Sequence, residues 1–244
     1  MTAAFRKRLL DAATAPYRPA GHFAWHFARG KLSRDPVFFS FLRHGLLPAE
    51  CRIVDLGCGQ ALLSNLLTAA HRLHAAGDWP ADWPAPPVLH AYRGIELMEK
   101  DVARARPALP ACAEVVQGDI RHAAFGDANV AIILDSLHYI DRAAQDAVLT
   151  RVRDTLRPGG TLLMRVGDAA AGLPFKLCMW VDRTVTFVRG HRLGELHCRP
   201  AADWQAGLEA LGFSVRTMPM DAGTPFANTL LVCRLDAPGA QPAV

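Results

Sequence analysis

Residues 53–67 read IVDLGCGQALLSNLL: a short apolar run ends in an aspartate, two glycines flank a cysteine, and a leucine-rich stretch follows. The apolar run is typical of a buried strand, and the leucine-rich stretch is typical of a helix. Glycines at such a junction let the backbone turn sharply and come close to a ligand at the helix N-terminus. This stretch therefore predicts a strand–loop–helix unit that holds a ligand at its loop.

The chain from residue 52 onward continues this alternation of strands and helices. We expect helices at about 61–76, 97–106 and 142–156, the last one closed by the turn RPGG at 157–160. Such alternation implies an α/β fold with a parallel sheet and right-handed crossovers, whereas two final strands without a helix between them predict an antiparallel hairpin. The expected strands are 52–56, 91–96, 113–117, 129–134, 161–166, 213–219 and 228–234.

The pattern of helix starts and apolar residues predicts a basic, amphipathic helical extension over the first fifty residues. Asp35 followed by Pro36 is a typical helix start, and Gly45 can end that helix. Residues 1–50 contain eight Lys/Arg and three Asp/Glu, a net charge of +5, whereas the remainder contains 19 and 20, a net charge of −1. This excess suits an anionic partner, although a solvated helical face explains it equally well. We expect an extension at 1–50, a main domain at 51–235 and a disordered tail at 236–244.

The composition is that of a soluble globular protein, with 51% hydrophobic and 20% charged residues. No apolar run reaches the roughly 18 residues of a membrane span, and the N-terminus lacks the apolar core of a secretory signal. Six cysteines without a C-x-x-C pair are typical of reduced thiols, and no histidine pair has the ligands of a metal site nearby. We therefore expect a cytoplasmic protein without a metal or an integral membrane segment, with peripheral membrane contact left open.

Acidic residues follow five of the expected strands. Ligands of open α/β sheets bind beyond the carboxyl ends of the strands, so these acids are candidates for one site. A carboxylate after the second strand suits ribose hydroxyls, and one after the third suits an adenine amino group. The ordered set is Asp55 with Gly57, Cys58 and Gly59, then Glu96, then Asp119 with Ile120, then DSLHY at 135–139, and finally Asp168 after the fifth strand.

The chain resembles the class I S-adenosylmethionine-dependent methyltransferases over roughly residues 51–235. The segments that carry the resemblance are VDLGCGQA, GIEL, QGDI, IILDSLHYI and LRPGG. It implies a Rossmann-like, seven-stranded, mostly parallel sheet with a C-terminal antiparallel hairpin, and S-adenosyl-L-methionine as the cofactor. The donor-binding residues that it implies are Asp55, Gly57, Cys58, Gly59, Glu96, Leu97, Asp119, Ile120 and Asp135, with Arg29 and Lys31 of the extension at the donor's carboxylate.

Two departures from the family pattern concern the first loop. The family usually has a third glycine where this chain has Ala61, which cannot adopt a positive φ at low cost. Glu96 lies 39 positions after Gly57, and a Pro/Trp-rich insertion at 77–88 accounts for much of that length. An NAD(P)-binding oxidoreductase is the alternative, but its third glycine is replaced by Leu62 and no catalytic Tyr-Lys pair is found.

His138 is the candidate general base, because it follows Asp135 by three residues and a histidine titrates near neutrality. By the resemblance, Asp135 would lie near the sulfonium and the incoming substrate. Tyr139 is either a substrate contact or a core aromatic. We name His138, Asp135 and Tyr139 as catalytic candidates, and expect residues 172–199 to shape the substrate pocket.

The acceptor is indicated by a weaker resemblance. RGKLSRDPVF, LDSLHYI and RPAADWQAGLEALGF are similar to methyltransferases of bacterial aryl-polyene biosynthesis, which implies an aryl or acyl substrate, free or tethered to an acidic acyl carrier protein. A nucleic-acid substrate is disfavoured by the low net charge and by the lack of an Asn/Asp-Pro-Pro motif after the fourth strand. A non-catalytic S-adenosylmethionine-binding module is a further alternative. Monomer and dimer both remain open.

Overall fold

The computed structural model describes residues 2–170, 196–220 and 228–236. The predicted tail at 237–244 and most of the predicted substrate-shaping segment lie outside the described residues. In the part of the chain that is described, no helix is both long and apolar enough to cross a membrane.

Two compact units divide the chain, Met1–Val130 and Ala131–Val244, and β4 (Ala128–Leu134) crosses the boundary. The first unit contains α1 (Ala3–Thr14), η1 (Ala15–Tyr17), α2 (His22–Arg34), α3 (Pro36–Arg43), β1 (Glu50–Leu56), α4 (Leu62–Ala75), β2 (Val88–Glu96), α5 (Glu99–Ala105), η2 (Arg106–Ala108) and β3 (Ala113–Gln117). The second contains η3 (Leu137–Tyr139), α6 (Arg142–Thr155), β5 (Leu156–Gly167), α8 (Ala201–Ala210), β6 (Phe213–Pro219) and β7 (Asn228–Leu235).

Parallel pairing in the first unit brings the carboxyl ends of β1, β2 and β3 to one edge. Asp55 lies opposite Gly94, and Glu96 lies opposite Gln117. Consecutive residues of β1 are buried from Ile53 to Leu56, as expected of a parallel strand that is covered on both faces. Because all three strands end at the same edge, the residues that follow them can meet one ligand.

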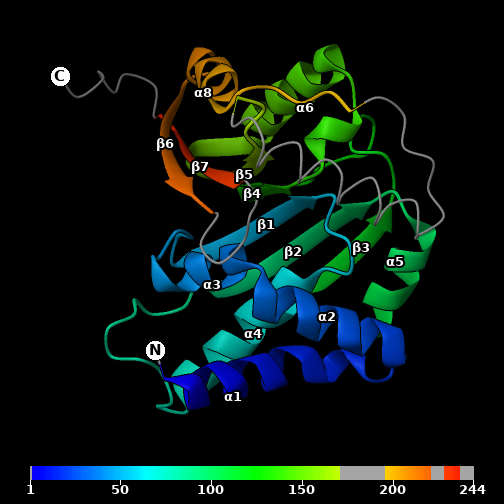
Figure 1. The fold of residues 1–244 in the computed structure, drawn as a ribbon, viewed down its shortest axis with the longest axis vertical. Helices are drawn as coiled ribbons and strands as arrows, with labels where there is room; N and C mark the ends of the chain where they lie inside the picture. The colour runs from blue at the N-terminus through cyan, green and yellow to red at the C-terminus, as the bar shows by residue number, and fades with distance from the viewer. Residues whose placement is uncertain (1, 171–195, 221–227, 237–244) are drawn as a thin grey trace. The chain divides into compact units, whose positions relative to one another are not determined.

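The N-terminal residues pack on this unit, with α1 beside α4 (Figure 1). The predicted start of α3 is confirmed, since Pro36 is its first residue and Asp35 Oδ1 accepts a hydrogen bond from the Val37 amide at 3.1 Å. Phe5 of α1 makes edge-to-face ring contacts with Trp79 and Trp83 at centroid distances of 5.5 and 5.8 Å. The Pro/Trp-rich insertion is thereby attached to the first helix.

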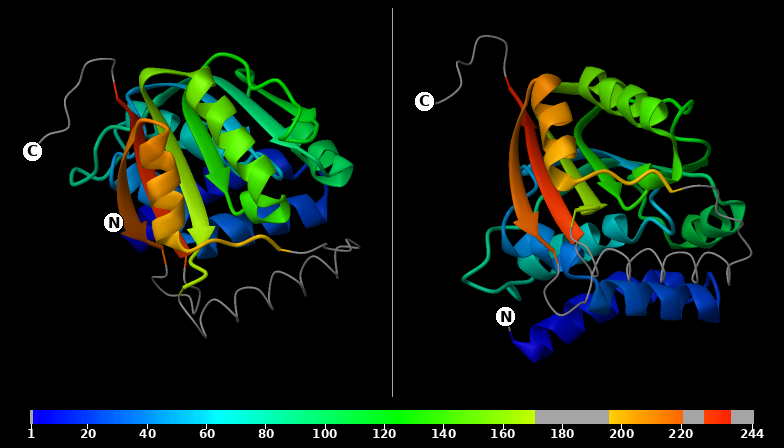
Figure 2. Two further views of the ribbon diagram at one scale, coloured as in Figure 1. Left: turned by 90° about the horizontal axis from the view of Figure 1, so that it is seen from above. Right: turned by 45° about the horizontal axis from the view of Figure 1, so that its top comes forward.

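The second unit is built on antiparallel pairs. β7 pairs with both β5 and β6, so that Leu231 lies opposite Met164 on one side and Thr217 on the other. Leu231 and Met164 are completely buried. α8 lies beside β6, and α6 contacts β5 (Figure 2).

The seven strands form one sheet in the order β3-β2-β1-β4-β5-β7-β6. This confirms the predicted Rossmann-like α/β sheet with its C-terminal antiparallel hairpin. Two strand starts are wrong: β2 begins at Val88 and not at residue 91, and the RPGG segment, predicted as a turn, belongs to β5. α6 ends at Thr155 because Leu156 already has an extended backbone, with φ −73° and ψ 135°. Pro158 therefore follows the helix as expected, but with the geometry of a strand.

Gly94 leaves room for Cys58 of the loop after β1. A Cβ at residue 94 would lie 2.5 Å from the Cys58 Sγ and 3.1 Å from Cγ2 of Val115. We expect Gly94→Ala to lower the free energy of unfolding by about 1–3 kcal/mol, because the added methyl group overpacks this contact. In a Cys58→Ala background the loss should fall to about half or less, measured by urea unfolding as a double-mutant cycle. Equal losses in both backgrounds would contradict the contact.

Candidate functional site

Asp55 stands at the carboxyl end of β1 as a buried carboxylate. Its Oδ2 accepts a hydrogen bond from the Tyr92 hydroxyl of β2, at 2.5 Å. Burial raises the pKa of Asp55 to about 7; the Tyr92 hydrogen bond lowers this pKa, and the charge of Glu96 raises it. A carboxylate whose pKa is shifted this far by its surroundings is typical of a functional site.

The loop after β1 turns through positive φ at alternate residues: Gly57 (80°), Gly59 (56°) and Ala61 (56°). The amides of Gly57 and Cys58 both donate to the Ile95 carbonyl, at 2.8 and 3.2 Å, which ties the loop to β2. Ala61 thus adopts the left-handed conformation, although the Cβ of alanine makes that conformation unfavourable. That conformation costs roughly 1–2 kcal/mol for a residue with a Cβ. It is retained in the turn that leads into α4.

Glu96 joins the end of β2 to the same loop. Its Oε2 accepts from the Gly59 amide and its Oε1 from the Met98 amide, both at 2.8 Å. Burial raises the pKa of Glu96, while the Met98 and Gly59 amides lower it. The carboxylate is therefore held in one orientation at the point where the loop passes β2.

The adenine-side candidates differ in their surroundings. Leu97, directly after Glu96, is 61% exposed, and Ile120 is buried. Asp119 is engaged by Arg121, with Nε at 3.0 Å from Oδ1 and Nη2 at 2.5 Å from Oδ2. The hydrogen bond and charge of Arg121 lower the pKa of Asp119, so this carboxylate is ionised and keeps acceptor capacity for a ligand.

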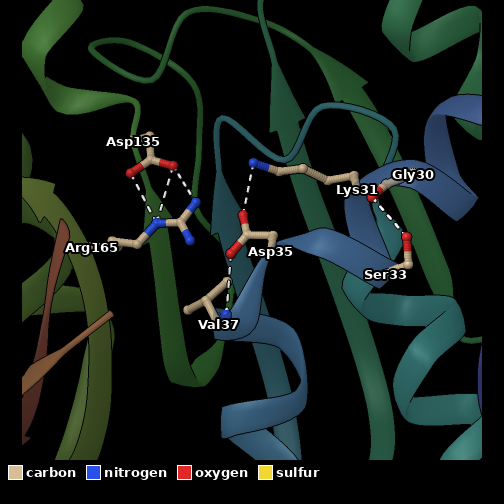
Figure 3. Close-up of polar contacts among 7 residues, drawn as sticks. All are labelled: Gly30, Lys31, Ser33, Asp35, Val37, Asp135 and Arg165. Carbon is tan, nitrogen blue, oxygen red and sulfur yellow. Dashed lines mark hydrogen bonds and ion pairs between the residues drawn. The ribbon is translucent and has the colours of Figure 1, made fainter. Parts of the chain in front are cut away.

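Arg29 and Lys31 of α2 are both paired with carboxylates. Arg29 Nη1 lies 2.5 Å from Asp11 Oδ1. Lys31 Nζ lies 2.8 Å from Asp35 Oδ2, the carboxylate that also caps α3 (Figure 3). A role for either cation at the donor's carboxylate would require it to leave or share its present partner.

Three polar residues of the first unit were missed by the sequence analysis: Tyr17, Asn65 and Tyr92. The Tyr17 hydroxyl donates to the Gln60 carbonyl at 2.8 Å and accepts from Asn65 Nδ2 at 3.1 Å. All three side chains are buried. No local pattern indicates these contacts, because the Tyr17–Gln60 bond spans 43 residues and the Tyr92–Asp55 bond spans 37.

Asp135 follows β4 in the second unit and has a positive φ of 57°. The buried guanidinium of Arg165 faces its carboxylate (Figure 3), with Nε 3.0 Å from Oδ1 and 3.1 Å from Oδ2. Strained backbone of this kind clusters at functional sites. The ion pair with Arg165 suits an electrostatic or orienting role for Asp135 better than proton abstraction.

His138 of η3 is buried in the same unit. Burial lowers its pKa, against a smaller rise caused by Asp135, so the ring is neutral at physiological pH. Among the described residues its Nε2 has no hydrogen-bond partner. Tyr139 is 43% exposed, with its ring centroid 4.1 Å from that of His138. Tyr139 is therefore not a core aromatic.

Gln145 of α6 organises the backbone around His138 and was also missed by the sequence analysis. Its Nε2 donates to the carbonyls of Leu137, Ile140 and His197, at 3.1, 3.0 and 2.7 Å. The His197 amide in turn donates to the His138 carbonyl at 2.9 Å. The η3 turn is thereby fixed to the segment that precedes α8.

At the carboxyl ends of its parallel strands, the first unit has more hydrogen-bond acceptors than donors among the side chains of Asp55, Glu96 and Gln60. The carboxylates of Asp55 and Glu96 and the buried Gln60 Oε1, which lacks a hydrogen-bond partner among the described residues, suit a ligand that carries ammonium and hydroxyl donors. No group of three or more metal-ligating side chains occurs in the ranges that the structure describes.

Comparison with known proteins agrees with this chemistry. Residues 54–164 match the family described as "Methyltransferase domain". A carboxy-S-adenosyl-L-methionine synthase of Chromohalobacter salexigens is 30% identical over 117 residues, which cover 46% of this chain and 38% of that protein. The chain thus spans well under two thirds of this relative's length.

Solved structures share the fold at lower identity. An O-methyltransferase family protein from Burkholderia thailandensis has a TM-score of 0.61 at 19% identity, covering 89% of this chain and 59% of that one. The O-methyltransferase NcsB1 of neocarzinostatin biosynthesis, solved with S-adenosylmethionine and 2-hydroxy-5-methyl naphthoic acid, has a TM-score of 0.55 at 20% identity, covering 86% and 56%. Identities this low establish the fold alone. Together with the match of residues 54–164 to the methyltransferase domain, they show that this part of the chain is similar to S-adenosylmethionine-dependent methyltransferases and that the chain has their fold.

Proposed function

We propose that the protein transfers a methyl group from S-adenosyl-L-methionine to a small aryl or acyl substrate. The observation that carries this proposal is the hydrogen bond between the Gly59 amide and the Glu96 carboxylate, beside the buried Asp55, within the matched methyltransferase region. Glu96 would accept hydrogen bonds from the ribose hydroxyls, and Asp55 with the Gly57–Gly59 turn would hold the methionine side. Leu97 and Ile120 would pack against the adenine, and Asp119 would accept from its amino group.

Catalysis would consist mainly of positioning. S-adenosyl-L-methionine supplies a methyl group that is already activated on a sulfonium. Holding an acceptor in line with that bond can contribute roughly 7–11 kcal/mol of barrier reduction. His138 would take the proton of the acceptor hydroxyl, because its ring is neutral and its buried Nε2 has no partner in the described ranges. Asp135, held by Arg165, would orient the site, and the exposed Tyr139 would contact the substrate.

The aryl character of the substrate is supported by the weaker sequence resemblance and by the naphthoic acid bound in NcsB1. Both sources favour a phenolic acid as the first acceptor to test, either free or as a carrier-protein thioester. We also propose a cytoplasmic location, which the free thiols of the five described cysteines support.

The first test measures donor binding by isothermal titration calorimetry with S-adenosylhomocysteine. We expect Asp55→Asn and Glu96→Gln each to weaken binding by about 10- to 100-fold, because each removes a charged acceptor worth about 1.5–3 kcal/mol. The matched control is Glu114→Gln, at an exposed carboxylate near the start of β3 that pairs with Arg93. Binding of NADH in place of S-adenosylhomocysteine would instead support the oxidoreductase alternative.

The second test concerns His138. With a hydroxybenzoic acid or its carrier-protein thioester as acceptor, His138→Asn should reduce turnover by about 100-fold or more and leave donor affinity unchanged. Because burial lowers the pKa of His138, the wild-type rate should fall only as the pH drops below 6.5, where the ring gains its proton. His90→Asn, an exposed histidine beside Glu50, serves as control. Unchanged turnover in His138→Asn would exclude this role.

The carrier-protein proposal rests on the basic extension. Lys7, Arg8, Arg29 and Lys31 form ion pairs with carboxylates. Within the described part of the chain, no carboxylate lies within ion-pair distance of Arg6, Arg18, Arg34 or Arg43, all of which are exposed. These four arginines would meet the acidic carrier protein.

Charge reversal at two of these positions tests the proposal. The double variant Arg34→Glu/Arg43→Glu should weaken binding of an acyl carrier protein and make that binding less dependent on salt. Binding is measured by fluorescence anisotropy between about 50 and 300 mM salt, a range over which the Debye length falls to about half. Arg153→Glu/Arg216→Glu, two exposed positions in the second unit, makes the same change in net charge. If both double variants bind alike, the extension is only a solvated face.

A further inference from the structure

The peptide unit between Gln60 and Ala61 is held from both sides. Its carbonyl, on Gln60, accepts the Tyr17 hydroxyl at 2.8 Å, and its amide, on Ala61, donates to the Cys58 carbonyl at 2.9 Å. The plane of this peptide sets the φ of Ala61, which is 56° with a ψ of 40°. A left-handed residue other than glycine persists only where its surroundings hold it in place.

Tyr17 is well placed to hold this peptide. It lies in η1, between α1 and α2, and its side chain is fully buried. Asn65 of α4 donates to the Tyr17 hydroxyl at 3.1 Å and to the Ala108 carbonyl at 3.0 Å, so the phenol is oriented by a residue that is itself fixed. Burial also raises the pKa of Tyr17, which keeps the hydroxyl protonated as a donor.

We infer that Tyr17 is a positioning residue for donor binding: its hydroxyl holds the Gln60–Ala61 peptide and thereby maintains, without a third glycine, the turn that a glycine would adopt unaided. The inference rests on the proposed function, since it treats this turn as part of the donor loop. Tyr17 acts on the donor only through the loop. The N-terminal residues are then required for donor affinity.

The loop geometry explains how one hydroxyl has this effect. Gly59, one residue before Gln60, donates its amide to Glu96, and Ser64 donates its amide to the Ala61 carbonyl at 3.2 Å. If the Gln60–Ala61 peptide rotates, the Gly59 amide and the first turn of α4 move with it. The acceptors that would meet the donor then lose their common geometry.

The experiment compares Tyr17→Phe, which removes only the hydroxyl, with the wild type in calorimetry with S-adenosylhomocysteine. We expect the dissociation constant to rise about 5- to 20-fold, the range for one hydrogen bond to a loop carbonyl. The control is Thr14→Val, which removes a buried hydroxyl that donates to the Leu10 carbonyl at 2.8 Å within α1. It should leave the dissociation constant unchanged.

The decisive variant is Tyr17→Phe/Ala61→Gly. Glycine adopts positive φ without support, so this double variant should bind S-adenosylhomocysteine within about twofold of Ala61→Gly alone. A purely structural loss at Tyr17 would persist in the double variant. Amide hydrogen exchange of residues 57–64 provides a second readout that needs no donor: it should be faster in Tyr17→Phe and return toward the wild-type rate in the double variant.

The outcomes separate the two proposals. If the wild type does not bind S-adenosylhomocysteine, the proposed function fails, and hydrogen exchange alone decides whether Tyr17 holds the turn. If Tyr17→Phe binds like the wild type, or if Ala61→Gly does not restore binding, the inference is overturned. If Tyr17→Phe does not fold, Asn65→Leu replaces it, because Asn65 orients the Tyr17 hydroxyl. A loss of donor affinity smaller than that expected for Tyr17→Phe, and reversed by Ala61→Gly, supports the inference. An unchanged donor affinity refutes it.

Discussion

The hydrogen bond from the Gly59 amide to the Glu96 carboxylate connects the two strand ends from which the candidate site is built. Because β1 and β2 are parallel and pair regularly from Arg52 to Leu56, both strands end at one edge of the sheet. Gly59, whose amide makes this bond, has a left-handed backbone with φ 56°. Charged hydrogen bonds are about twice as strong as neutral ones, so the bond fixes the loop and the carboxylate together. The orientation of Glu96 is thus set by backbone groups.

The acids of the two units have different electrostatic surroundings. Asp55 and Glu96 are buried, their pKa values are raised by that burial, and they are stabilised by a hydroxyl and by backbone amides. Asp135 instead lies against the buried guanidinium of Arg165. A carboxylate without a cationic partner gains more from a ligand's ammonium or hydroxyl groups than a neutralised one does. Asp55 and Glu96 are therefore suited to binding a ligand, whereas Asp135 is suited to stabilising the backbone beside His138.

The sequence predicted those parts of the fold and site that depend on neighbouring residues. Strand ends could be read from the change between apolar runs and glycine or acidic residues, and the start of α3 from Asp35-Pro36. Contacts between distant residues could not be predicted: the bonds of Tyr17 and the three donations of Gln145 leave no local pattern. The two alternatives for Tyr139 could not be separated from the sequence, because an aromatic residue after a buried strand is often covered by the next element; here its side chain is 43% exposed.

Ala61 shows how a local rule and a distant contact combine. The rule that a residue with a Cβ resists positive φ holds, and the structure nevertheless has φ 56° at this residue. Alanine also brings advantages over glycine: its methyl group is completely buried, and it restricts the unfolded chain more. These gains offset part of the strain only if contacts from other parts of the chain hold residue 61 in the left-handed conformation. Tyr17 and the Cys58 carbonyl impose it, so the identity of residue 61 and the presence of the N-terminal residues depend on each other.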